Sequence, residues 1–307
     1  MTGKPAIAVI GAGLMGAGIA LVFAAAGHRV ALFDAIAEAR ATALQRIRNN
    51  LAAVGLDPEA ATAVTLHAQL APAVADADFV IEAAPEDLAL KQGLFAEVEA
   101  AAKPTAILAS NTSVIPITSI MERLRNKARA LGTHWWNPPY LVPLVEVIRT
   151  VDTADATIEA TLKLLASVGK TAVEVKKDVP GFIGNRLQHA LWREAVALVA
   201  DGVCDAKTVD EVVKASFGTR LAVLGPLENA DLVGTDLTRS IHNYVLPALD
   251  RSTAASPYLD RLVEQGRLGF KSGEGFRKWT PEQQAALRER VTKHLQASFG
   301  APVSVRE

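Results

Sequence analysis

Four polar residues, His134, Glu146, Ser113 and Asn185, are of the types needed to oxidise an alcohol. That reaction needs a base that takes the hydroxyl proton, and a histidine can do this near neutral pH. A carboxylate beside the histidine would fix its tautomer and stabilise the imidazolium that forms. We expect the serine and the asparagine to hold the substrate's oxygen and carbonyl group.

Three of these four residues also have a structural explanation. His134 could be a satisfied histidine at the end of a strand, Glu146 a buried carboxylate paired with an arginine, and Ser113 a helix cap. Glu146 is the only charge in the apolar run 144–148, and a buried carboxylate needs a partner. Because all four residues are expected at the edge of one predicted sheet, the catalytic interpretation is favoured.

A hydride acceptor could bind at the start of the chain, where residues 6–33 have the pattern strand, loop, helix, strand. The loop contains Gly11, Gly13 and Gly16, which suit a tight turn, a close approach to a pyrophosphate and close packing of the helix on the strand. Free N–H groups at the helix N-terminus favour the pyrophosphate anion. We therefore predict a dinucleotide site rather than an ordinary turn.

Asp34 follows Gly16 by eighteen residues, at the end of the second strand. A carboxylate there accepts hydrogen bonds from the adenosine ribose and repels a 2′-phosphate, so the sequence predicts NAD rather than NADP. Arg40 is the first cation after it. With Arg46 and Arg48 it lies in a predicted helix over 37–51, where the arginines form either a solvated face or a binding site for a phosphorylated or CoA-bearing substrate.

The rest of the chain predicts an α/β protein in which residues 1–180 bind the dinucleotide and residues 181–307 are helical. The boundary is Pro180-Gly181, after which no further buried strand is expected. Polar residues 110–113 end a strand, where α/β sheets bind ligands, and His134 is expected directly after another strand. The further strands are predicted at 64–66, 79–82, 106–109, 144–148 and 171–175, and the further helices at 88–101, 117–124, 152–167, 182–200, 207–216, 224–233, 237–249 and 280–298.

Composition narrows the class of protein. The chain has 307 residues, half of them apolar, and a formal net charge of −1. Its basic residues are scattered, which argues against nucleic acid as a partner, and no apolar run is long enough to predict a membrane span. One cysteine, Cys204, excludes an internal disulfide. Because the first apolar run leads into the glycine loop, no signal peptide is expected, and the cytoplasm is the predicted location.

Nearly the whole chain resembles the 3-hydroxyacyl-CoA dehydrogenases. The runs that carry this resemblance are 11–16, 82–88, 110–113, 134–138, 144–147, 180–183, 185–187 and 271–276. The resemblance implies a Rossmann-type NAD-binding domain, a helical domain that carries the substrate and homodimer contacts, and a place in fatty acid metabolism. It implies no metal ligand.

The same resemblance assigns roles to single residues. His134 would be the catalytic base and Glu146 its partner, with Ser113 and Asn185 binding the substrate. Residues that would contact NAD are Gly11, Gly13, Leu14, Met15, Gly16, Asp34, Glu86, Lys91, Ser113, Asn137 and Lys271. The expected reaction is the oxidation of a 3-hydroxyacyl-CoA to a 3-oxoacyl-CoA.

Some runs depart from the usual fatty-acid enzymes. Trp135-Trp136 stands where those enzymes generally have two phenylalanines, and the run 137–146 looks more like the lambda-crystallin and L-gulonate 3-dehydrogenase branch. The run 176–182 also resembles a relative that acts on a pyridine carboxylate aldehyde. Two alternatives therefore stay open: the same chemistry on a free hydroxy acid or a small carboxylated alcohol or aldehyde, and a crystallin-like NAD-binding protein without catalysis.

Overall fold

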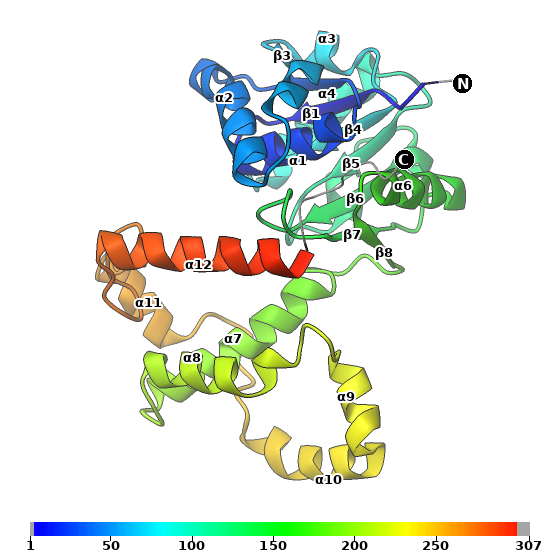
Figure 1. Cartoon of the computed structure of the whole chain (residues 1–307). Helices are drawn as coiled ribbons and strands as arrows, with labels where there is room; N and C mark the ends of the chain where they lie inside the picture. Colours follow the sequence, from blue (N-terminus) through cyan, green and yellow to red (C-terminus); the bar gives the residue numbers. More distant parts are fainter. Residues whose placement is uncertain (1–2, 300–307) are drawn as a thin grey trace. The chain divides into compact units, whose positions relative to one another are not determined.

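Residues 3–299 are described by a computed structural model, in which eight strands form one sheet (Figure 1). The spatial order is β3-β2-β1-β4-β5-β6-β7-β8. Every neighbouring pair is parallel except β6 and β7, which are antiparallel. The strands are β1 Ile7–Ile10, β2 Val30–Phe33, β3 Val64–His67, β4 Phe79–Glu82, β5 Ile107–Ser110, β6 Ala130–Trp135, β7 Leu144–Ile148 and β8 Thr171–Val175.

Helices cover both faces of the sheet, which explains why its inner strands are nearly continuous apolar runs. Side chains alternate between the two faces, so that Val9 joins one buried cluster and Ala8 the other. On the face of Val9 lie α1 Leu14–Ala25, α2 Ala37–Ala53 and α6 Asp155–Ser167. On the opposite face lie α3 Leu70–Val74, α4 Leu88–Ala101 and α5 Ile117–Ile120.

The order of the strands places a topological switch point between β1 and β4, which is where open α/β sheets bind ligands. The glycine loop follows β1 and therefore lies at this point. The predicted α/β class with a dinucleotide-binding N-terminal part is confirmed, and all of the predicted strands are present with shifts of a residue or two at their ends.

Several helix predictions differ from the structure. The predicted helix 117–124 ends as α5 at Ile120. A 3-10 helix that was not among the predicted helices, η1 Pro58–Ala63, is capped by Asp57. Helix α3 was not predicted, because its five residues are too few to show a helical period and include Pro72. The other short 3-10 helices are η2 Lys127–Arg129, η3 Phe217–Thr219 and η4 Leu246–Ala248.

The chain divides into two compact units, residues 1–186 with 290–307, and residues 187–289. The second unit contains most of α7 and the first part of α12. Its helices are α7 Gly184–Ala200, α8 Ala206–Ala215, α9 Pro226–Val233, α10 Thr235–Val245, α11 Pro257–Glu264 and α12 Pro281–Phe299. None of the helices within residues 3–299 has both the length and the apolar character needed to cross a membrane.

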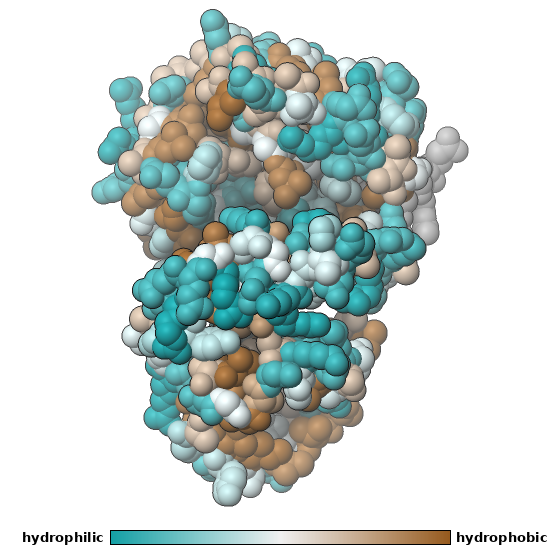
Figure 2. Space-filling view, turned by 90° about the vertical axis from the view of Figure 1, so that its left-hand side faces the viewer, coloured by the Kyte–Doolittle hydropathy of each residue, from teal (hydrophilic) through white to brown (hydrophobic). Residues whose placement is uncertain are grey.

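Much apolar surface is exposed on the second unit. Within its residues, all of which the structure describes, Leu262 is the only buried apolar side chain. Figure 2 shows apolar side chains on the surface in the lower part of the view, as well as in the upper part. The most exposed apolar side chains of the second unit are Val203, Val223, Leu227, Leu232 and Tyr244. A surface of this kind is typical of a unit that packs against another protein chain.

Candidate active site

His134 and Glu146 face each other across the antiparallel pair β6–β7. The His134 Nδ1 atom lies 2.7 Å from the Glu146 Oε2 atom. Both residues are buried, with exposed fractions of 3% and 1%. When Nδ1 donates its proton to the carboxylate, the lone pair of Nε2 remains available to accept a proton.

The structure corrects two positions in this region. His134 was expected after a strand but is the fifth residue of β6, and Ser113 lies three residues beyond the end of β5 rather than at its end. The reason is that β6 extends beyond the end of β5, its parallel neighbour. Pairing with β5 stops at Ser110 and Gly132, whereas pairing with β7 continues to Trp135.

The second oxygen of Glu146 is held by the backbone that leads into α7. Its Oε1 atom accepts hydrogen bonds from the N–H groups of Ile183 at 2.9 Å and Gly184 at 3.1 Å. Just before them, Phe182 has a φ of +50°, in the left-handed region that a bulky side chain rarely adopts. The strained turn thus directs two N–H groups at one carboxylate.

These contacts keep Glu146 ionised. Burial raises the pKa of Glu146, but the hydrogen bonds from His134 and from the backbone N–H groups of Gly184 and Ile183 outweigh it and hold the pKa below its usual value. The carboxylate is therefore charged at neutral pH and can stabilise a protonated His134. The aromatic rings of Trp136 and Phe182 flank the imidazole, with centroids at 5.1 and 5.6 Å.

Ser113 and Asn185 are brought together, as their predicted shared role requires. The Asn185 Nδ2 atom donates to the backbone carbonyl of Ser113 at 2.9 Å. Ser113 is exposed, and its hydroxyl forms no hydrogen bond within residues 3–299. The Ser113 hydroxyl and the Asn185 amide oxygen are therefore the groups of this pair that could face a ligand.

The glycine loop has the geometry that the sequence predicted for two of its glycines. Gly11 has a φ of +99°, and a Cβ there would lie 2.6 Å from the carbonyl oxygen of Ala83. A Cβ at Gly16 would lie 1.7 Å from the carbonyl oxygen of Gly11. A side chain is impossible at either position without a movement of the backbone.

Gly13 differs, because a Cβ there would meet no atom within 4 Å. Packing within the protein therefore does not require glycine at this position. The predicted close approach of a pyrophosphate would require it. The first residues of α1, Leu14 and Met15, carry the backbone N–H groups of the helix N-terminus. Asp34 accepts the Ala12 N–H at 2.7 Å, which ties its carboxylate to the same loop. These features fit a dinucleotide.

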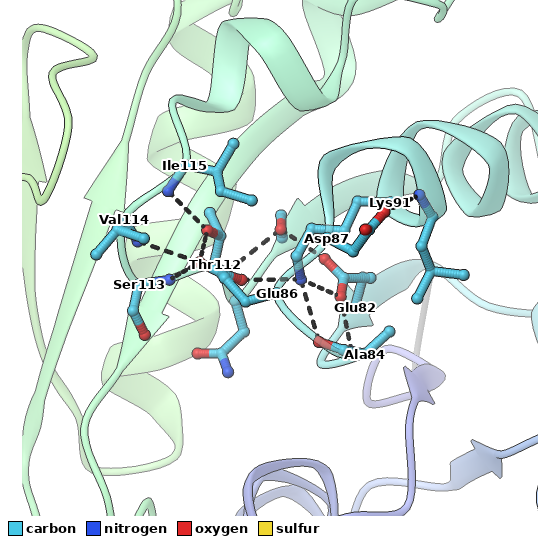
Figure 3. A network of polar contacts seen from close by, with 12 residues as sticks. Glu82, Ala84, Glu86, Asp87, Lys91, Thr112, Ser113, Val114 and Ile115 are labelled. Atoms are coloured by element: carbon cyan, nitrogen blue, oxygen red, sulfur yellow. Dashed lines mark hydrogen bonds and ion pairs between the residues drawn. The ribbon is translucent and has the colours of Figure 1, made fainter. Parts of the chain in front are cut away.

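A buried ion network lies beside the loop, at the start of α4 (Figure 3). The ammonium group of Lys91 is 1% exposed and is surrounded by three protein oxygens: Glu82 Oε1 at 2.6 Å, the Ala84 carbonyl at 3.2 Å and Glu86 Oε2 at 3.3 Å. The first two contacts are hydrogen bonds that Lys91 donates, and the third is an ion pair. Its contact with NAD stays a prediction, and its observed contacts position Glu86.

Glu86 links this network to the polar run after β5, as the residues drawn in Figure 3 show. Its Oε1 atom accepts the Thr112 hydroxyl and the N–H groups of Ser113 at 3.0 Å and Val114 at 3.2 Å. Burial raises the pKa of Glu86, but the Thr112 hydrogen bond, the Lys91 charge and the two N–H groups together lower it. Glu86 is therefore an ionised, half-exposed carboxylate next to Ser113.

Two residues of this region, Glu82 and Lys170, were not predicted as site residues. Glu82 is fully buried and accepts the Ser110 hydroxyl at 2.6 Å, beside Lys91. Lys170 is also buried and donates to the carbonyls of Pro139 and Val142, in the segment that connects β6 to β7. One signal in the sequence could have revealed Glu82: like Glu146, it is a single charge in an apolar strand.

Two predicted cofactor residues remain outside these clusters. Asn137 is exposed and lies two residues beyond the end of β6. Lys271 is exposed and belongs to the second unit. Their contacts with NAD stay predictions.

Comparison with known proteins agrees with this geometry. The sequence model of the family described as "3-hydroxyacyl-CoA dehydrogenase, NAD binding domain" matches residues 6–179. The one described as "3-hydroxyacyl-CoA dehydrogenase, C-terminal domain" matches residues 181–279.

Two relatives and one solved structure illustrate the similarity. A "5-formyl-3-hydroxy-2-methylpyridine 4-carboxylate 5-dehydrogenase" of Mesorhizobium japonicum is 36% identical over 300 residues, covering 95% of this chain and 96% of its own. A "probable 3-hydroxybutyryl-CoA dehydrogenase" of Bacillus subtilis is 37% identical over 278 residues, covering 88% and 96%. A crystal structure of a 5-formyl-3-hydroxy-2-methylpyridine 4-carboxylic acid 5-dehydrogenase, described as an NAD+ dependent dismutase, has a TM-score of 0.89 and 36% identity, covering 96% and 97%. The chain belongs to the 3-hydroxyacyl-CoA dehydrogenase family and is an NAD-dependent oxidoreductase.

Proposed function

We propose that the protein oxidises the 3-hydroxyl group of a 3-hydroxyacyl-CoA to the 3-oxo group, with His134 as the base and Glu146 as its partner. The observation that carries this proposal is the buried 2.7 Å contact between His134 Nδ1 and Glu146 Oε2. The family match and the relative described as a 3-hydroxybutyryl-CoA dehydrogenase support the choice of substrate.

The protein's own groups perform the proton transfer. The Nε2 atom of His134 accepts the proton of the substrate's hydroxyl group. At the same time the hydrogen on the carbon that bears this hydroxyl leaves as hydride. NAD, when bound, supplies the acceptor for that hydride. Glu146 holds the imidazole by Nδ1 and offsets the positive charge that develops on the ring. Trp136 and Phe182 shield the ring from water, which strengthens this interaction.

The remaining predicted residues would hold the two ligands. We assign the NAD site to the glycine loop, Asp34 and the ionised Glu86. Ser113 and Asn185 would orient the substrate oxygen, since the hydrogen bond from the Asn185 side chain to the Ser113 backbone carbonyl holds the two residues together. Asn137, Lys91 and Lys271 are proposed as further NAD contacts on the resemblance alone.

A second candidate is the same chemistry on a free carboxylate substrate, such as a hydroxy acid or a small carboxylated alcohol or aldehyde. The relative from Mesorhizobium japonicum, whose name gives a pyridine carboxylate as the substrate, covers nearly the whole chain and favours this candidate. The tryptophan at position 136, which lies beside His134, is a further difference from the usual fatty-acid enzymes.

Steady-state kinetics with NAD would distinguish the candidates. The enzyme should be given 3-hydroxybutyryl-CoA, free 3-hydroxybutyrate, L-gulonate and a pyridine carboxylate aldehyde in parallel, with NADH formation as the readout. Turnover of the CoA ester well above that of the free acids is the expected result. No turnover of the CoA ester at millimolar concentration would contradict the first candidate, and no turnover of any substrate would favour a non-catalytic, crystallin-like protein.

We further propose that residues 181–307 form a domain for substrate binding and homodimerisation and that the protein works in the cytoplasm, in fatty acid metabolism. The exposed apolar side chains of the second unit support self-association, because a second copy could cover them. Light scattering after size exclusion should give twice the mass of the 32.5 kDa chain. A monomeric mass at micromolar concentration would contradict the homodimer.

A further inference from the structure

Two arginines of α2 reach the dinucleotide loop. The Arg40 Nη1 atom donates to the backbone carbonyl of Asp34 at 2.6 Å. The Arg46 Nη1 atom donates to the backbone carbonyl of Ala12 at 2.8 Å, and its Nη2 atom donates to the Thr42 hydroxyl at 3.1 Å. Both guanidinium groups thus lie against the two segments that meet at the Asp34 carboxylate.

Neither arginine is neutralised by an acid in the structure. Within residues 3–299, no carboxylate lies within ion-pair distance of Arg40 or Arg46, and their acceptors are backbone carbonyls and a hydroxyl. Both side chains are half-buried, so their charges are less screened than those of fully exposed arginines. Glu38, the acid in the first turn of α2, is exposed to solvent.

Both oxygens of the Asp34 carboxylate accept hydrogen bonds from backbone N–H groups. Asp34 Oδ2 accepts the Ala12 N–H at 2.7 Å, and Asp34 Oδ1 accepts the Ile36 N–H at 2.9 Å. In a dinucleotide-binding sheet the carboxylate at this position binds the ribose hydroxyls and repels a 2′-phosphate. Among the residues that the structure describes, Arg40 and Arg46 are cations near it without an ion-pair partner.

We propose that Arg40 and Arg46 form a site able to hold a phosphate on the ribose 2′-oxygen once the repulsive charge of Asp34 is removed. Guanidinium groups suit this ligand, because they donate two parallel hydrogen bonds to a phosphate. The proposal rests on NAD binding to the glycine loop and is independent of the substrate proposed above. It also gives the two arginines a role at the dinucleotide rather than at a CoA phosphate.

The test is isothermal titration calorimetry with two probes, ADP-ribose and ADP-ribose 2′-phosphate, which differ only in that phosphate and need no turnover. Wild-type protein should prefer ADP-ribose. Asp34→Asn should bind the 2′-phosphate compound at least about tenfold more tightly than wild type does, because one repulsive charge is gone. This gain should shrink as salt is added.

The arginines are tested in the Asp34→Asn background. Adding Arg40→Gln or Arg46→Gln should weaken binding of the 2′-phosphate compound by about fivefold or more and change ADP-ribose binding by less than about twofold. Arg48→Gln is the matched control, since Arg48 lies on the same helix and makes no hydrogen bond to the loop within the described residues. It should leave both affinities unchanged.

Three outcomes would overturn the proposal. Asp34→Asn could fail to improve binding of the 2′-phosphate compound, or the added arginine substitutions could leave that binding as tight as before. Asp34→Ser serves as a second variant in case the asparagine disturbs the loop. If both variants fold, as judged by circular dichroism, and lose both probes, the carboxylate is required for the loop itself and the proposal is wrong.

Discussion

The side chains of His134 and Glu146 meet because the sheet reverses direction between β6 and β7. In the antiparallel register His134 stands opposite Glu146, so the two side chains point to the same face and their Nδ1 and Oε2 atoms come within 2.7 Å. A parallel connection between the two strands would need a longer crossover than the eight residues available between Trp135 and Leu144. The single antiparallel pair of the sheet thus creates the proposed base.

Replacing His134 should separate catalysis from cofactor binding. We expect His134→Ala to lower the turnover rate by about 10² to 10⁴, the usual contribution of a positioned base, and to leave the dissociation constant of NADH unchanged. The measurements are steady-state kinetics and a fluorescence titration with NADH. His28→Ala is a control, because His28 is equally buried but contacts the Pro5 carbonyl. Turnover near wild type in His134→Ala would contradict the assignment.

Glu146→Gln should reduce turnover in a folded protein. The amide can still accept from Ile183 and Gly184 but cannot offset the charge of a protonated His134. Because the folded state lowers the pKa of Glu146, its carboxylate stabilises the fold above its usual pKa, and this contribution is lost as pH falls through the lowered value. Urea unfolding at neutral and acid pH should therefore show a difference between wild type and variant that shrinks in acid. An unfolded variant at neutral pH would favour a structural role.

Gly13→Ala and Gly16→Ala should fail in different ways. An alanine at Gly13 meets no protein atom, so the protein should keep its melting temperature but bind NADH more weakly, because the methyl group obstructs the pyrophosphate. An alanine at Gly16 collides with the Gly11 carbonyl and should lower the melting temperature. Thermal unfolding and NADH titration of the two variants provide the comparison. Unchanged NADH affinity in Gly13→Ala would contradict the placement of the pyrophosphate.

Lys170 should make stability depend on pH. Burial lowers the pKa of Lys170 to about 8. Between that value and its ordinary pKa, the unfolded chain carries the proton and the folded chain does not, so the free energy of unfolding should rise with pH, by at most about 3 kcal/mol. Lys170→Met should remove this rise. Urea unfolding from pH 7 to pH 10 measures the difference, and identical slopes in wild type and variant would contradict it.

Much of the fold could be predicted because its signals are local. The composition and the hydrophobic period of residues 6–33 predict the strand, the glycine loop and the helix. The spacing of Asp34 from Gly16 singles out that carboxylate in the same way. Helix α11 was not predicted, although Ser256 caps it and Pro257 is its first residue, a pattern typical of a helix start. Helix α3 has no such signal.

The site was predicted less completely, because its contacts join distant parts of the chain. The sequence shows that Glu82 and Glu146 are lone charges in apolar strands, which demands a partner for each, but it does not say which partner. Lys91 reaches Glu82 across the turn into α4, and His134 reaches Glu146 across β6 and β7. The turn from β4 into α4 decides the first pairing, and the register of β6 against β7 decides the second.

By itself the sequence determined the α/β class, the dinucleotide loop and the residue types available for hydride chemistry, since each depends on neighbours within about thirty residues. Only the tertiary structure decided that β6 extends to Trp135, that Phe182 adopts a strained turn which gives Glu146 two N–H groups, and that Arg40 and Arg46 point at the loop. The physical reason is that a side chain's partner follows from the direction and register of elements that are brought together only when the chain folds.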